Sequence, residues 1–305
     1  MDTAATPRRR PATCRTLAPA RAYLPAIPTE AAVLGTLVRA SPSRRGAPAG
    51  CGQTHLPAVP AGLLIWVQAE PAQPPGAPAP SQAALSAGLY LSGPRERPQT
   101  LMHAPDADLT VVMLRPEAWH ARTHTDWAAW KDRLVPACEW CGAAASPLTR
   151  GVQACMSGHE RARAVESLLH EGDGVSSGAG GNSGLLGWWQ GLDARLAQRS
   201  VGERQRERLA RAWTGLTPRM LRAQARAEAA LVHAAALLQR NQLDWREVAL
   251  LAGYTDQPHL CRETRRLTGF SPVQLMRGML GDEAFWVYRA WAMARLGGSG
   301  PGWAG

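Results

Sequence analysis

The sequence of 305 residues predicts an α+β protein, in which a small β-rich domain is followed by an all-α domain with tandem helix-turn-helix units. Two observations support this prediction. A motif that ends one helix and begins the next occurs twice in the second half, whereas the first half consists of short apolar runs separated by proline and glycine. With 45% hydrophobic residues, the chain can form the cores of about two domains.

The repeated motif is TGLTP at Thr214–Pro218 and TGFSP at Thr268–Pro272. In each copy, glycine allows the left-handed conformation that ends a helix, and the hydroxyl residue before proline caps the next helix. Between the copies, residues 219–240 predict one uninterrupted helix, which is ~30 Å long at about 1.5 Å per residue. This length is close to the ~34 Å between successive major grooves on one face of B-DNA.

The second copy of the motif follows a predicted helix from about Gln257 to Leu267, with Asp256 as its N-cap. One face of this helix is apolar, because Leu260, Thr264 and Leu267 follow the i, i+4, i+7 spacing. A half-apolar helix with an arginine face is typical of the reading helix of a helix-turn-helix unit. The other face carries Pro258, Arg262, Arg265 and Arg266.

The run from Val248 to Pro272 resembles the C-terminal signature of AraC/XylS-type transcriptional regulators. The resemblance covers roughly residues 185–290 and implies two helix-turn-helix units on one linker helix. Its first reading helix lies within Gly202–Gly215. This segment departs from the family pattern at Arg206, where an apolar residue is usual, and at Ala210, where a large aromatic residue is common.

The resemblance and the helix faces together predict the residues that contact DNA. Arg262 is the first choice for a specific base contact. An alternative is that Arg262 and Arg208 hold phosphates, which would position the helices without reading sequence. A further alternative is that they pair with the internal acids Glu263 and Glu207. The predicted DNA-binding residues are Gln257, Pro258, His259, Arg262 and Arg265 in the second unit, and Arg204, Gln205 and Arg208 in the first.

The charge distribution agrees with this placement. The formal net charge is +10, and residues 193–289 hold sixteen arginines against ten acids, whereas residues 51–192 are mildly acidic. Lys131 is the only lysine, so the positive charge is carried by guanidinium groups, which pair bidentately with phosphate or guanine. A codon bias towards arginine explains the choice of basic residue but not its clustering.

In the first half, short apolar runs predict a small sheet or barrel. Three segments, Leu56–Pro60, Leu91–Pro94 and Leu109–Pro116, look like the N-terminal sensing domain of one AraC subgroup, a degenerate cupin-like barrel. No His-x-His pair with a following Glu is present, so the metal site of cupins is not expected. An effector pocket is expected between the strands of residues 23–121. The predicted strands are Val33–Val38, Gly62–Val67, Ala87–Leu91 and Leu109–Leu114, and residues 126–170 are predicted to be helical.

The predicted domain boundaries follow from composition. Because glycine and serine dominate residues 172–184, we expect a flexible linker there, and a piece of the chain starting near Leu185 is expected to fold and bind DNA alone. The predicted parts are a disordered basic tail (1–20), a sensor or dimerisation domain with trailing helices (21–171), the linker (172–184), the DNA-binding domain (185–290) and a disordered tail (291–305).

The cysteines suggest a second, competing interpretation. Cys138 and Cys141, followed by Cys155 and His159, have a spacing that could hold zinc. Helical cysteines in an alanine-rich segment more often pack as small hydrophobic residues, so neither a metal nor another cofactor is expected. In the competing interpretation, the helix-turn-helix units deliver a DNA-repair, redox or zinc protein that acts through Cys138 and Cys141.

The favoured prediction is a sequence-specific DNA-binding transcriptional regulator that is not an enzyme. Its partner is double-stranded DNA. The sequence leaves open three further partners: a small-molecule effector, RNA polymerase and a second copy of the chain in a homodimer. It also leaves open that the sensor domain mediates only partner contact. No apolar run approaches the ~18 residues of a membrane span and no signal-peptide core is present, so a cytoplasmic location is expected.

Overall fold

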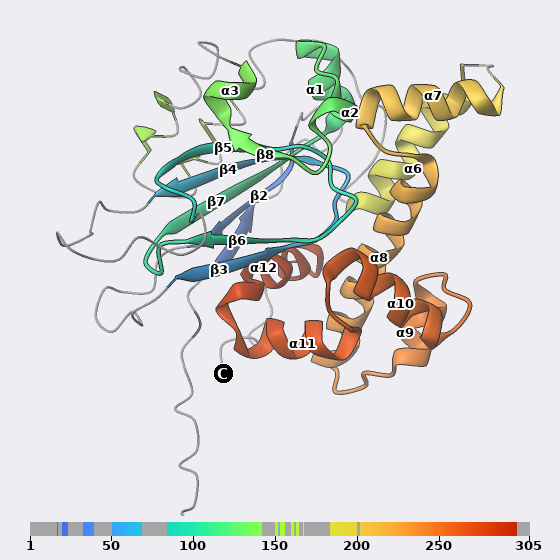
Figure 1. Cartoon of the computed structure of the whole chain (residues 1–305). Coiled ribbons are helices and arrows are strands. Elements are labelled where there is room, and N and C mark those ends of the chain that lie inside the picture. Colours follow the sequence, from blue (N-terminus) through green and yellow to red (C-terminus); the bar gives the residue numbers. More distant parts are fainter. Residues whose placement is uncertain are drawn as a thin grey trace, which may run out of the picture.

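The computed structural model describes residues 20–23, 33–39, 51–68, 84–141, 184–199 and 202–297, together with residue 17 and isolated positions from 150 to 167. Within these ranges a β-rich part precedes a helical part, as the sequence predicts (Figure 1). The linker predicted at 172–184 lies outside the described residues except for its last position.

The β-rich part contains a six-stranded antiparallel sheet and a separate two-stranded sheet (Figure 1). The apolar runs predicted as strands are confirmed as β2, β4, β5 and β7. In the order in which neighbours pair, the large sheet consists of β1 (Ala20–Tyr23), β2 (Val33–Arg39), β7 (Asp108–Leu114), β4 (Gly62–Gln68), β5 (Gly88–Ser92) and β8 (Leu134–Pro136), and the small sheet pairs β3 (Gly52–Leu56) with β6 (Gln99–His103).

The expectation of helix throughout residues 126–170 is wrong at β8. Val135 of this strand pairs with Leu91 of β5 and is only 7% exposed. Three residues are too few to produce a periodic apolar pattern, so the pairing depends on the neighbouring strand rather than on a local preference.

The helices frame the large sheet and form the second half of the chain (Figure 1). The long helix expected at 219–240 and the helix expected at 257–267 are confirmed as α8 and α10, and the reading role of α10 stays a prediction. The helices are α1 (Pro116–Thr123), α2 (Trp127–Trp130), α3 (Ala137–Cys141), α6 (Gly184–Ala197), α7 (Glu203–Thr214), α8 (Pro218–Gln239), α9 (Trp245–Leu251), α10 (Gln257–Thr268), α11 (Pro272–Gly281), the short 3-10 helix η2 (Glu283–Phe285) and α12 (Trp286–Arg295).

Both copies of the repeated motif form the turn that they predict. Gly215 and Gly269 have φ angles of 73° and 83° and end α7 and α10. Thr217 and Ser271 then cap α8 and α11, because each hydroxyl accepts a hydrogen bond from the backbone N–H three residues later, at 3.2 and 3.3 Å. The same local chemistry therefore builds the end of both reading helices.

The central strand β4 is buried on both faces, with side chains alternating between two cores. Leu63 and Ile65 lie in a core that includes α12, whereas Leu64 and Trp66 lie in a core with Trp127 of α2. Figure 1 shows α1, α2 and α3 on one side of the sheet, and α12 with β3 and β6 on the other. The large sheet is thus the middle layer of the fold.

The final helix α12 joins the helical part to the sheet. Trp286 and Ala290 belong to the same core as Leu37 and Ile65, and the Trp286 side chain is fully buried. Residues from 291 onward were expected to be a disordered tail, but Trp291 is 7% exposed and α12 continues beyond it. The division of function at the linker stays a prediction, but the two parts share an apolar core.

A chain of hydrogen bonds accompanies this apolar contact. The Trp286 indole donates to the Thr54 hydroxyl at 2.9 Å, which lies 3.0 Å from Nε2 of His103. The other ring nitrogen, Nδ1, lies 2.7 Å from the carbonyl oxygen of Ala104. Since a carbonyl only accepts, Nδ1 carries a proton. Burial lowers the pKa of His103 and so favours the neutral ring, in which Nε2 accepts from the Thr54 hydroxyl.

We expect Trp286→Ala to lower the free energy of unfolding by about 3–5 kcal/mol, because a fully buried indole is removed and a cavity is left. Leu250→Ala is the control, since that side chain is 77% exposed and its loss should change stability by less than about 0.5 kcal/mol. Urea unfolding followed by circular dichroism measures both. Equal effects would contradict the docking of α12 on the sheet.

Stability should fall as the pH is lowered from about 7.5 to about 5.5. The folded-state pKa of His103 lies below its ordinary value of 6.5, and burial lowers that of His55 too, so the unfolded chain takes up protons first. The stabilisation is present above pH 6.5 and is lost as the pH falls through the lowered values. His103→Asn should flatten this slope in urea titrations.

Candidate nucleic-acid interface

The helix α10 has the two faces that its sequence predicts. Leu260 and Leu267 are each 1% exposed and Thr264 is 6% exposed, and they hold the helix on the protein. The opposite face is open to solvent. Its exposed residues are Pro258, Arg262, Arg265 and Arg266.

The arginines on this face are not equivalent. Arg266 donates to both carboxylate oxygens of Glu263 at 3.0 Å, and these hydrogen bonds lower the pKa of Glu263. Arg262 and Arg265 form no ion pair or hydrogen bond within the residues that the structure describes. The alternative pairing of Arg262 with Glu263 is therefore not formed, and two guanidinium groups point to solvent without a partner.

The start of α10 is held by a side-chain N-cap and by an aromatic contact. Asp256 caps the helix by accepting from the backbone N–H of His259 at 2.6 Å. The His259 ring packs edge-on against Tyr254, with ring centroids 5.2 Å apart. Tyr254 is buried, which raises its pKa to about 12. Gln257 and His259 are half-buried, so they frame the exposed arginines.

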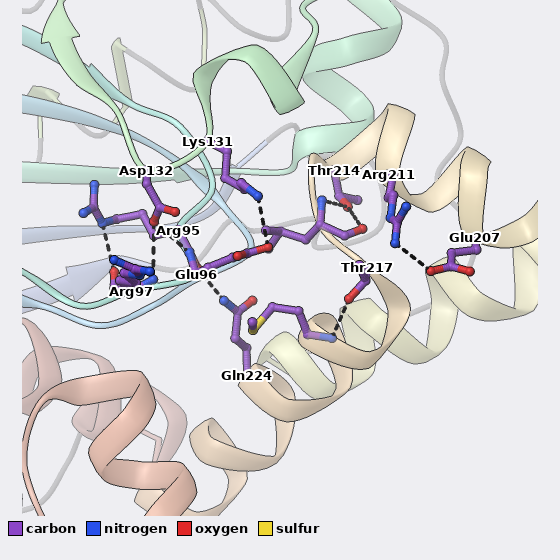
Figure 2. A network of polar contacts seen from close by, with 12 residues as sticks. Arg95, Glu96, Arg97, Lys131, Asp132, Glu207, Arg211, Thr214, Thr217 and Gln224 are labelled. Carbon is purple, nitrogen blue, oxygen red and sulfur yellow. Dashed lines mark hydrogen bonds and ion pairs between the residues drawn. The ribbon is translucent and has the colours of Figure 1, made fainter.

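The first reading helix, α7, presents a similar face. Arg204 and Arg208 are exposed and unpaired among the described residues, and Gln205 is half-buried. Glu207 binds Arg211 at 2.9 Å, one turn further along, and not Arg208 (Figure 2). The predicted residues of both units thus lie on solvent-facing or rim positions of two separate helices.

The two departures from the family pattern have different consequences in α7. Arg206 is exposed, so a charged residue is tolerated at this position. Ala210 is fully buried in a core that also contains Trp188 and Trp189 of α6. Two indole rings therefore accompany the small residue in this core.

The helix α8 spaces the two units. Its 22 residues give a length of ~33 Å at about 1.5 Å per residue. Figure 1 shows α7 near one end of α8 and α10 towards the other. The arginine faces of the two units are therefore separated by a helix whose length is close to the ~34 Å between successive major grooves.

The β-rich part contacts α8 directly through the loop after β5. Gln224 of α8 donates its side-chain N–H to the carbonyl oxygen of Arg95 at 2.6 Å (Figure 2). Asp132 holds this loop by accepting from the backbone N–H groups of Glu96 and Arg97 at 2.9 and 3.3 Å. No local sequence pattern predicts this contact, because the two residues are 129 positions apart in the chain.

The turns that end both reading helices also touch the β-rich part. A Cβ atom at Gly215 would lie 2.9 Å from the backbone of Trp127, so only glycine fits between them. At the second turn, the carbonyl oxygen of Leu267 accepts from the backbone N–H of Ala58 at 2.7 Å. The first half of the chain is thus positioned to affect both units.

The cysteine constellation is only partly within the described residues. Cys138 is exposed, whereas Cys155 is half-buried and donates to the carbonyl oxygen of Gly151. Burial raises the pKa of Cys155, which disfavours the reactive thiolate. The side chain of Cys141 and all of His159 lie outside the described residues, and within those residues no group of three or more His, Cys, Asp or Glu could hold a metal.

Two helix-turn-helix units with arginine faces, joined by one long helix, define a DNA-binding protein of the transcription-regulator class. Residues 196–278 match the family model described as a helix-turn-helix domain. This part of the chain is an AraC-type helix-turn-helix domain, which confirms the resemblance seen in the sequence. No curated protein matches the chain.

Two solved structures of ToxT from Vibrio cholerae are similar to the chain at low sequence identity. The structure from strain O395 has 8% identity and a TM-score of 0.33, and the match covers 74% of this chain and 97% of that one. A structure at 1.65 Å resolution has 7% identity and a TM-score of 0.35, with coverage of 75% and 97%.

We expect Arg262→Ala to weaken specific DNA binding by ~1–3 kcal/mol and to relax base preference at one position, because an unpaired guanidinium on a reading helix can bind a guanine bidentately. The DNA site is first selected from a random library with the wild-type protein, and affinities are then measured on it and on its single-base variants. Arg21→Ala removes the same charge from an exposed position of β1 and should leave base preference unchanged. Equal weakening on all sequences would make Arg262 a phosphate contact.

Proposed function

We propose that this protein regulates transcription by placing α7 and α10 in adjacent major grooves on one face of double-stranded DNA. The observation that carries the proposal is the pair of exposed, unpaired arginine faces, on α7 at Arg204 and Arg208 and on α10 at Arg262 and Arg265. The helix between them has nearly the length of one turn of B-DNA.

The chemistry of these faces suits a duplex. Guanidinium groups without internal partners lose no protein ion pair when they bind, and each can donate two parallel hydrogen bonds to a guanine or a phosphate. Two acids on the same helices, Glu207 and Glu263, are already paired with Arg211 and Arg266. The exposed arginines therefore offer DNA a positive charge that these two carboxylates do not neutralise.

In this proposal Arg262 and Arg208 make the principal base contacts, and Arg265 and Arg204 add base or phosphate contacts. Gln257 and His259 frame the start of α10, where Pro258 also contacts the groove, and Gln205 plays the same part in α7. A small-molecule effector, RNA polymerase and a second copy of the chain remain predictions as partners. Among the described residues, none of the helices has the length and apolarity needed to cross a membrane.

The competing function, a repair, redox or zinc protein acting through Cys138 and Cys141, has its own test. It requires bound zinc or a thiol that reacts rapidly at neutral pH. Metal analysis of the purified protein and a thiol titration therefore separate the two proposals. Stoichiometric zinc, or one fast cysteine whose loss abolishes an activity on DNA, would favour the competing function.

Reading by two helices predicts two half-sites about 10–10.5 base pairs apart. Arg208→Ala should relax base preference in one half-site and Arg262→Ala in the other. Inserting about five base pairs between the half-sites moves one of them to the opposite face of the duplex, so affinity should fall to that of a single unit. Binding titrations on both DNAs measure this effect.

Two outcomes would contradict two-groove reading. If both arginine substitutions alter preference at the same bases, or if the lengthened DNA binds as tightly as the original, only one unit reads sequence. A five-base-pair insertion outside the two half-sites is the matched control and should leave affinity unchanged.

A further inference from the structure

The open side of α8 carries a row of basic residues along its whole length. The row consists of positions that recur every three or four residues, and these fall within an arc of roughly 100° around the helix. The arginines at both ends of the row are exposed, and its middle positions are half-buried. We call it the basic row, and its members are Arg219, Arg222, Arg226, Ala229, His233, Ala236 and Arg240, which directly follows the helix.

Charge is divided between the two sides of α8. Every basic residue of the helix lies on the basic row. Its single acid, Glu228, lies on the opposite side, where it is 8% exposed and accepts from the Trp291 indole at 2.8 Å. Gln224 lies on that side too and donates to the loop after β5 (Figure 2). One side of α8 therefore holds the β-rich part, and the other presents positive charge to solvent.

The arginines of the basic row form no ion pair with an acid among the residues that the structure describes. Arg222 donates to the carbonyl oxygen of Pro218 in its own helix at 3.3 Å. The Arg226 guanidinium lies over the Tyr254 ring, 5.2 Å from its centroid, and its buried Nε has no hydrogen-bond partner. Guanidinium groups without an acidic partner bind anionic oxygens strongly, so the row fits a ligand that presents several anions along a line.

The second copy of the repeated motif provides an internal comparison. Helix α11 follows that copy as α8 follows the first, 54 positions earlier. The positions of α11 that match Arg219 and Arg226 are Val273 and Leu280, which are 49% and 47% exposed. The turn and the helix after it therefore do not require arginine at these positions, and a codon bias would act on both helices alike. The arginines are a property of the linker helix in particular.

The basic row lies between the two arginine faces. It begins directly after the turn that ends α7. Towards α10, Arg226 lies over Tyr254, whose ring packs against His259 at the start of that helix. Arg266 of α10 also donates to Sδ of Met220, in the first turn of α8, at 3.5 Å. The row and the arginine face of α10 therefore border the same surface.

We propose that the basic row binds the phosphates that border the minor groove between the two half-sites, which rests on the proposed function. When α7 and α10 occupy successive major grooves on one face of a duplex, the minor groove lies between them and α8 spans it. The ~10 Å from Arg219 to Arg226 passes about six phosphates, since B-DNA carries one per ~1.7 Å of its axis. Arg219 and Arg222 bind these phosphates, and Arg226 joins the row to the start of α10.

This contact gives the linker helix a part in binding as well as in spacing. Phosphates carry no sequence information, so the row strengthens binding equally on all sequences and sets the register of both reading helices on the duplex. The bases between the half-sites are not read by the row.

The first test is the salt dependence of DNA binding by the full-length protein with both Arg219→Gln and Arg222→Gln. Glutamine is a good helix former without the charge, and both positions are exposed, so circular dichroism should show an unchanged fold. Each phosphate contact adds about −0.9 to the slope of log affinity against log salt, so raising salt from about 50 to about 200 mM costs about 3.5-fold per contact. The double variant should therefore lose about twelvefold less affinity than the wild type over this range.

Base preference and a matched variant complete this test. On the selected site and its single-base variants, the double variant should keep the base preference of the wild type, because only phosphate contacts are lost. Arg21→Gln removes one charge from an exposed position of β1 and should leave the salt dependence unchanged.

The second test locates the contacts on the DNA. The selected site is made with neutral methylphosphonates in place of the phosphates between the two half-sites. The wild type should bind this DNA more weakly than unmodified DNA, whereas the double variant, which has lost the groups that bind there, should bind both DNAs with nearly equal affinity. Methylphosphonates placed outside the half-sites are the control and should affect both proteins equally.

Three results would overturn the basic row as a phosphate site: an unchanged salt dependence in the double variant, equal weakening of both proteins by the methylphosphonates between the half-sites, or an altered base preference. Failure of the proposed function has a different signature. A wild-type protein that selects no two-part DNA site overturns the proposed function and the basic row with it, whereas a two-part site bound with unchanged salt dependence by the double variant overturns the basic row alone.

Discussion

The docking of α12 on the large sheet is the constraint on which the other contacts between the two parts depend. Trp286 fills the core below β4 and donates to Thr54, so apolar and polar contacts fix the same side chain. With α12 held there, the Trp291 indole donates to Glu228 and ties α8 to the sheet. The Trp286 and Trp291 indoles together thus hold α12 between the large sheet and α8.

The β-rich part is also in contact with the equivalent point of both units. Trp127 lies against the turn at Gly215, and the backbone of Ala58 is bonded to the last turn of α10. Because the contacts involve backbone and glycine, they define position more strictly than contacts between flexible side chains would. Any shift of the sheet relative to α8 would therefore be transmitted to both turns together.

Local chemistry predicted much of this fold and of its candidate interface. The turns at Gly215 and Gly269 follow from glycine, hydroxyl and proline residues that act within a few positions, and the exposed placement of Arg262 follows from helical periodicity. What sequence could not predict depends on distant partners. The strand β8 is defined by β5, the role of Trp286 by strands more than 170 positions earlier, and the contact of Gln224 by a carbonyl in a loop of the first half.

The place of α12 in the chain affects the way the protein is made. Synthesis proceeds from the N-terminus, so the strands leave the ribosome long before the helix that completes their core. Until α12 emerges, the part of the sheet's apolar face that Trp286 and Ala290 cover stays open. The nascent protein therefore passes through a stage in which this surface is exposed to chaperones or to aggregation. A chain that ends after α10 would lack part of the core of its β-rich half, and not only a C-terminal tail.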